Sequence, residues 1–305
     1  MKLYDILLLV AAFVAFPDTA VAAPPDAAAF IKARGWTAAK PAKPLKMPAD
    51  DIVPVVYFAD TSGSAGCGLL AQDKGETSFI EMLGPKPNAG WPQCTGINDV
   101  ASFKMDKKHY LVFEITHRET QKHVYPDYFY VFKNSVGGYT LDDKIGPEVP
   151  AKATPPLFKG KAKGALEGVR LAKAALIQRA ASGMALVRRD SLYADTAAYA
   201  VFGDQRHTKC VFILQTGGVL SKIDHTAFAS GDACIETLAT SRFDKNGKTY
   251  YMTMFRGLKQ KRMAIVSVTK DNVITAEREL AAQATAKAPL TDMRSVRMFL
   301  FPDPR

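Results

Sequence analysis

The stretch CGLLAQDKG at residues 67–75 has a counterpart later in the chain, CVFILQTGG at residues 210–218. Both follow the order cysteine, any residue, three apolar residues or alanine, glutamine, any two residues and glycine. The marked residues recur at one step of 143 positions, as Cys67 and Cys210, Gln72 and Gln215, and Gly75 and Gly218. Each stretch is typical of a strand that runs into a turn. The shared order and spacing indicate that one unit is present twice.

The match continues beyond these strands. FKMDKKHYLVFEI at residues 103–115 aligns with FDKNGKTYYMTMF at residues 243–255, and each contains a short polar turn followed by an alternating strand. A helix precedes each copy, since Asp26 caps AAAFIKAR before Gly35, and GALEGVRLAKAALIQRAAS ends at Gly183. The apolar residues of the second helix are expected near one face, namely Leu166, Val169, Leu176, Ile177, Ala180 and Met184.

These patterns predict an α+β fold that is predominantly β. We expect two tandem repeats, each an N-terminal helix followed by about five antiparallel strands with one disulfide. The predicted boundaries are residues 24–145 for the first repeat, 146–162 for a Pro/Gly/Lys-rich connector, and 163–305 for the second repeat. Within each copy the glutamine follows the cysteine by five residues, which places it on the opposite face of a strand. We therefore expect the cysteine in the core and the glutamine facing outward or capping the strand end.

Residues 1–23 are predicted to be a cleaved signal peptide. They contain Lys2, an apolar run from Ile6 to Phe16, and the small residues Ala20 to Ala23 as a cleavage site. The apolar run is too short to cross a bilayer, and the Pro17-Asp18 pair after it argues against a retained anchor. We expect a periplasmic or secreted protein that does not span a membrane after processing.

Four cysteines in an exported chain predict two disulfides. A zinc site is the alternative, but the chain has no C-x-x-C pair and no pair of histidines at zinc-binding spacing. Three connectivities are possible. Local closure favours Cys67–Cys94 and Cys210–Cys234, one disulfide in each repeat.

The net charge of +10 favours an acidic partner. We expect an acidic exported protein, with an anionic envelope polymer as the alternative, and export makes nucleic acid an unsuitable partner. The basic stretch between the repeats supplies Lys159, Lys161 and Lys163 as candidate partner-binding residues. A tyrosine-rich segment predicted as a loop, HVYPDYFY, adds Tyr125 and Tyr128 as interface anchors.

Catalytic patterns are weak in this sequence. His117 and His123 are expected in an exposed hairpin loop, and their spacing fits no common metal site. SGSAGCG at residues 62–68 lacks the offsets of a nucleophile elbow and the Gly-Lys-Ser/Thr ending of a phosphate loop. We therefore predict no catalytic residue, no metal and no cofactor.

Three classes of function remain. The first is an exported, non-catalytic binding or inhibitor protein, such as an immunity protein that neutralises a periplasm-acting toxin or hydrolase. The second is an envelope structural or polyanion-binding protein, and the third is a hydrolase whose catalytic groups come from distant loops. A basic, disulfide-linked β scaffold without a catalytic pattern favours the first class.

Overall fold

The computed structural model describes thirteen parts of the chain. They are residues 25–39, 45–59, 65–73, 76–82, 93–118, 124–135, 138–142, 145, 157–158, 162–187, 192–193, 197–206 and 208–302. The signal-peptide prediction for residues 1–23 lies outside them, as do Gly75, His123, His207, Lys159 and Lys161.

The N-terminal half consists of α1 and two four-stranded antiparallel sheets, in the orders β1-β2-β3-β4 and β5-β6-β7-β8. Its elements are α1 (Ala27–Ala33), β1 (Thr37–Ala38), β2 (Ile52–Phe58), β3 (Ala65–Asp73), β4 (Glu76–Glu81), β5 (Gln93–Met105), β6 (Lys108–Arg118), β7 (Val124–Ser135) and β8 (Gly138–Leu141). The carboxylate of Asp26 accepts a hydrogen bond from the N–H of Ala29, which confirms the predicted cap of α1.

The C-terminal half begins with α2 and adds two further antiparallel sheets and two closing helices. One sheet has the order β10-β11-β12-β13, with β9 also paired to β11, and the other has the order β14-β15-β16-β17. The elements are α2 (Ala165–Ala180), β9 (Ala185–Leu186), β10 (Leu192–Tyr193), β11 (Ala197–Gly203), β12 (Cys210–Thr216), β13 (Val219–Asp224), η2 (His225–Ala227), β14 (Glu236–Lys245), β15 (Lys248–Arg256), β16 (Lys261–Thr269), β17 (Ile274–Ala276), α3 (Arg278–Lys287) and α4 (Met293–Leu300).

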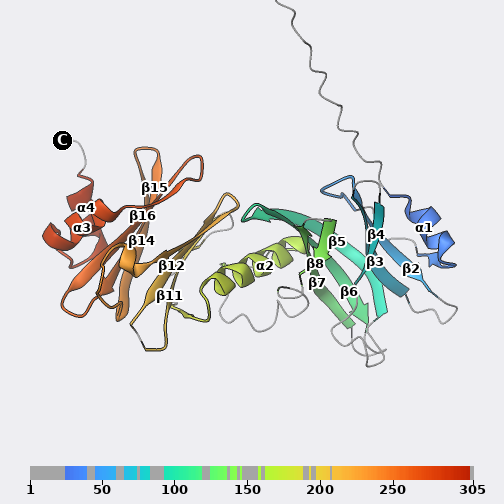
Figure 1. Cartoon of the computed structure of the whole chain (residues 1–305), viewed down its shortest axis with the longest axis horizontal. Coiled ribbons are helices and arrows are strands. Elements are labelled where there is room, and N and C mark those ends of the chain that lie inside the picture. Colours follow the sequence, from blue (N-terminus) through green and yellow to red (C-terminus); the bar gives the residue numbers. More distant parts are fainter. Residues whose placement is uncertain are drawn as a thin grey trace, which may run out of the picture.

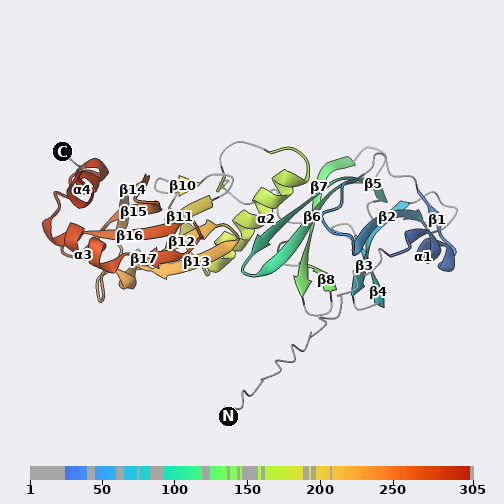
Figure 2. The same ribbon diagram turned by 90° about the horizontal axis from the view of Figure 1, so that it is seen from above.

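The four sheets and the helices are stacked in one line (Figure 1). From the N-terminal end the order is α1, the β1–β4 sheet, the β5–β8 sheet, α2, the β9–β13 sheet, the β14–β17 sheet, and α3 with α4. Figure 2 gives the same order from above. Apolar side chains fill the contacts between these layers. Because successive side chains of a strand point to opposite faces, each sheet contributes to a core on both of its sides.

Each half carries one disulfide between its two sheets. Cys67 in β3 is bonded to Cys94 in β5, and Cys210 in β12 is bonded to Cys234, just before β14. The predicted pairing is thus the one present in the structure, and the prediction of a predominantly β fold is confirmed. The predicted strand number is too low, because the described residues contain eight strands in the N-terminal half and nine in the C-terminal half. Each half forms two packed sheets rather than one.

Helix α2 is buried on two sides. Val169 and Leu176 pack with the β5–β8 sheet, and Ala174 and Ile177 pack with the β9–β13 sheet. The prediction of a single apolar face is therefore incomplete, and Leu166 is wrong as a core residue because its side chain is 59% exposed. A helix between two sheets needs small residues on two faces, which explains its many alanines.

The structure also corrects the loop that was predicted around His117. His117 lies in β6 opposite Cys94 and is fully buried, with its ring 5.8 Å from that of Tyr130. The strands β6 and β7 continue their pairing beyond a register shift between Ile115 and His117. Tyr125 and Tyr128 therefore belong to β7 rather than to a loop, and their side chains lie outside the described residues.

Candidate functional site

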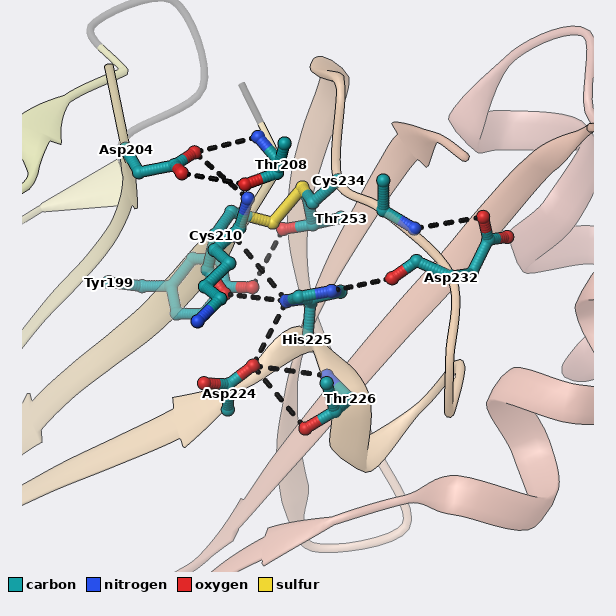
Figure 3. Close-up of a disulfide and its surroundings, with 12 residues drawn as sticks. Tyr199, Asp204, Thr208, Cys210, Asp224, His225, Thr226, Asp232, Cys234 and Thr253 are labelled. Atoms are coloured by element: carbon teal, nitrogen blue, oxygen red, sulfur yellow. Dashed lines mark hydrogen bonds and ion pairs between the residues drawn. A yellow bond between two sulfur atoms is a disulfide. The ribbon is translucent and has the colours of Figure 1, made fainter. Parts of the chain in front are cut away.

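Three loops meet around the Cys210–Cys234 disulfide (Figure 3). They are the β11–β12 loop at residues 204–209, of which residue 207 is not described, the segment at residues 225–235, and the β15–β16 hairpin at residues 256–262. We call this group of loops the loop end. The disulfide links Cys210, the residue directly after the first loop, to Cys234 in the second segment. The N–H of Ile235 donates to the carbonyl of Arg256 at 2.8 Å, which joins the third loop.

His225 connects these loops from the inside. Its Nε2 lies 2.8 Å from the carbonyl oxygen of Asp232, and its Nδ1 lies 2.9 Å from Oδ1 of Asp224. Figure 3 shows the ring between these two aspartates, beside the disulfide. The residue is only 2% exposed, and both of its ring nitrogens already face oxygen atoms of the loops. His225 therefore positions the loops and is not a candidate for acid or base catalysis.

Asp232 holds the β15–β16 hairpin. Its Oδ1 accepts hydrogen bonds from the N–H groups of Leu258 and Ala233, each at 2.9 Å, and its Oδ2 accepts from Nε of Arg262 at 3.0 Å. These donors, with the Leu258 N–H first, lower the pKa of the Asp232 carboxyl. Gly257 is required here, because a Cβ at this position would lie 2.4 Å from the carboxylate. The hairpin is thus fixed by one side chain from another loop.

Asp204 performs the same task in the β11–β12 loop. Its carboxylate accepts from the N–H and the hydroxyl of Thr208, both at 2.7 Å, and from the N–H of Lys209 at 2.9 Å. The Lys209 N–H and the Thr208 hydroxyl are the main causes of a lowered pKa at Asp204. Two carboxylates therefore order the backbone of two exposed loops.

The ordered loops present a basic surface with one large apolar side chain. Leu258 is 68% exposed at the hairpin. The exposed basic residues on the same loops are Arg206, Lys209, Arg256, Lys259 and Lys261. Among the acidic side chains, Asp232 and Asp204 are engaged in the loops, the half-exposed Asp224 contacts His225 and the N–H of Thr226, and Glu236 pairs with Arg256 at 3.1 Å. Lys259 follows Leu258 in the hairpin and is exposed.

The sequence did not single out the loop end. Of the predicted binding residues, Lys163 is described and exposed just before α2, on a different element. The signals that could have found the site are local: Asp232 precedes the half-cystine Cys234, and Gly257 interrupts a run of basic residues. Neither signal reveals that the Asp232 carboxylate contacts the backbone of Leu258.

The described residues contain no group of three or more histidine, cysteine, aspartate or glutamate side chains that could hold a metal ion. In the same part of the chain, no helix has the length and apolar character needed to cross a membrane. The loop end offers charged side chains, hydrogen-bonding groups and one exposed apolar side chain.

Comparisons with known proteins add little. No family model matches the chain, and no curated protein matches it. Among solved structures, the catalytic domain of the Coprinopsis cinerea GH62 alpha-L-arabinofuranosidase has a TM-score of 0.20 and 9% identity, over 79% of this chain and 73% of that chain. A levansucrase mutant from Bacillus subtilis has a TM-score of 0.22 and 11% identity, over 84% of this chain and 74% of that chain. Scores this low do not indicate a shared fold.

Proposed function

We propose that the protein is an exported, non-catalytic binding or inhibitor protein, and that its loop end docks onto an acidic partner protein. The observation that carries this proposal is the fixing of the exposed hairpin by Asp232, which holds Leu258 and its basic neighbours in one arrangement before any partner binds. A surface that is already ordered loses less conformational entropy on binding. The basic side chains would increase the rate of encounter with an acidic surface.

Such a surface suits a protein that neutralises an exported toxin or enzyme. An immunity protein or hydrolase inhibitor acts by covering the site of an exported toxin or enzyme, and it requires a rigid scaffold rather than catalytic groups. The disulfide beside the loops and the buried His225 supply that rigidity. Periplasmic or secreted localisation and a cleaved signal at residues 1–23 remain part of the proposal.

We also propose that the two halves are copies of one ancestral unit, with the boundaries 24–145, 146–162 and 163–305. Matching ring pairs support this. Phe103 and Tyr110 stack with ring centroids 4.7 Å apart on the β5–β6 hairpin, and Phe243 and Tyr250 stack at 5.2 Å on the β14–β15 hairpin.

Site-specific crosslinking in the producing cell tests the binding function. Leu258 is replaced by the photo-crosslinking residue p-benzoylphenylalanine in the full chain, and Val273 is replaced in the same way as a control. Both positions carry exposed apolar side chains, 68% and 57% exposed, on different hairpins of the same half. We expect one adduct at position 258, absent at position 273, whose mass-spectrometric identification gives an exported protein of net negative charge.

A second variant tests the role of charge. Replacing Lys259 by glutamate in the crosslinking background should reduce the yield of the adduct, since the long-range attraction to an acidic surface falls. Equal labelling at positions 258 and 273, no adduct at either, or an adduct with a basic protein would each contradict the proposed function.

A further inference from the structure

A second candidate site lies where the two halves meet, away from the loop end. A cleft of about 480 Å³ is lined by Phe103 and Lys104 of β5, Lys173 of α2, Gln215 and Thr216 of β12, Gly217 and Gly218 of the following turn, and Asn272. The two halves are in contact here, because the N–H of Asp106 donates to the carbonyl of Gly218 at 3.0 Å and the N–H of Leu220 donates to Oδ1 of Asp106 at 3.1 Å.

Gln215 is the unusual residue of this cleft. It lies on the face of β12 opposite Cys210, as predicted, but it is only 2% exposed rather than facing outward. The reason is that α2 and the N-terminal half cover this face of the sheet. Its Oε1 has no hydrogen-bond partner in the part of the chain that the structure describes. Buried polar atoms are nearly always paired, so an acceptor of this kind in a cleft wall indicates a donor from a ligand.

The charged groups of the cleft have one sign. Lys104 is exposed at the rim, and Nζ of Lys173 lies 5.8 Å from the centre of the Phe103 ring. No described residue that lines the cleft carries a carboxylate, and the nearby carboxylate of Asp106 accepts from the N–H of Leu220. The cleft therefore favours an anion.

The turn that closes the cleft depends on glycine. Gly217 has φ +52°, and a Cβ on it would lie 2.2 Å from the side-chain amide of Asn272. This close approach brings the amide of Asn272 to the cleft wall, where it can hydrogen-bond a ligand as well as the hydroxyl of Thr216, which lies 3.3 Å from its Oδ1. Uncharged hydrogen-bonding groups thus stand beside the two lysines.

We propose that this junction cleft binds a hydroxylated anion of monosaccharide size, a sugar acid or a sugar phosphate. The anionic group is placed at the exposed Lys104, and a hydroxyl donates to Oε1 of Gln215. A cationic amine is excluded as that donor, because the two lysines repel it. The volume is in the range of ordinary small-molecule sites and is too large for a bare inorganic anion alone.

Isothermal titration of the full chain at low ionic strength tests the site, with glucuronate, glucose 6-phosphate, glucose and inorganic phosphate as ligands. We expect glucuronate or glucose 6-phosphate to bind about tenfold more tightly than both glucose and inorganic phosphate, because only the first two offer an anion and hydroxyls together. The better of the two identifies the anionic group as carboxylate or phosphate.

Three variants assign the effect to the cleft. Lys104→Gln, at an exposed position, should weaken binding of the preferred ligand about tenfold, and Lys287→Gln, at an exposed lysine of α3 outside both candidate sites, should leave that binding unchanged. Gln215→Leu should remove the preference for the hydroxylated anion over inorganic phosphate. The inference is overturned if neither sugar anion binds, if inorganic phosphate binds as tightly as they do, or if the two lysine variants behave alike. Crosslinking at position 258 is independent of all three results.

Discussion

Replacing Gly168 by alanine tests whether α2 is a shared core element of both halves. Gly168 lies on the buried side of α2 that faces the β5–β8 sheet. A Cβ at this position would lie 2.6 Å from Cγ1 of Val112 and 2.5 Å from Cδ1 of Phe129. Both neighbours are buried in the middle of strands, with exposures of 0% and 4%, so neither side chain can move aside without disturbing its sheet.

Two opposing effects decide whether Gly168→Ala raises or lowers the free energy of unfolding. Alanine is a better helix former than glycine by about 1 kcal/mol, which would stabilise α2. Overpacking a well-filled core costs about 1–3 kcal/mol, and three contacts below 3 Å with two buried partners place this site in the upper half of that range. We therefore expect Gly168→Ala to lower the free energy of unfolding by about 1–2 kcal/mol.

Urea unfolding followed by circular dichroism measures this difference. Gly203→Ala is the matched control, because a Cβ on Gly203 would meet Val187 at an ordinary 3.5 Å and should leave stability nearly unchanged. If Gly168→Ala is as stable as the wild type, or more stable, the close packing of α2 against the N-terminal half is refuted.

The remaining predictions concern the disulfides and Asp232. The double variants are Cys67→Ala/Cys94→Ala and Cys210→Ala/Cys234→Ala, which open loops closed over 27 and 24 residues. Each variant should lose about 3–4 kcal/mol of unfolding free energy in a non-reducing urea titration. An unchanged unfolding midpoint would contradict this expectation. The lowered folded-state pKa of Asp232 means that its stabilisation is complete above the ordinary pKa of 3.8 and is lost as pH falls through the folded value. The stability difference between the wild type and Asp232→Asn should therefore narrow from pH 7 to pH 3, and a constant difference over that range would show that the carboxylate charge does not hold the hairpin.

The local features of the fold could be predicted from the sequence. The cap at Asp26, the disulfide pairs and the polar turns before β6 and β15 depend on residues close together in the chain. The turn residues have the expected left-handed backbone, with φ +50° at Asp106 and +51° at Asn246. Short-range chemistry is what a sequence pattern records well.

Features that depend on two distant segments could not be predicted in this way. Gln215 follows the expected alternation of β12, but its burial comes from α2 and the β5–β6 hairpin, which are far away in the sequence. The sequence around His117 resembles a loop. In the structure, β6 continues its pairing beyond a register shift, and the His117 side chain is buried in the core. The contact of Asp232 with Leu258 joins two loops 26 residues apart. In each case the burial or contact of the residue depends on a segment distant in sequence, which the residue's own neighbours in the chain do not indicate.

The layered stack also explains why both candidate sites lie at the margins of the sheets. Each of the four sheets is covered on both faces: α1 covers the first sheet, α2 lies between the second and third, and α3 with α4 covers the last. The candidate sites therefore lie where this cover is incomplete, at turns and strand ends and at the junction beside α2. At one such place Asp232 orders a hairpin, and at another the contact between halves leaves a basic cleft. Because α2 is packed against both halves, the cleft walls from β5, α2 and β12 are held at a fixed spacing, which is the condition for selecting one size of anion.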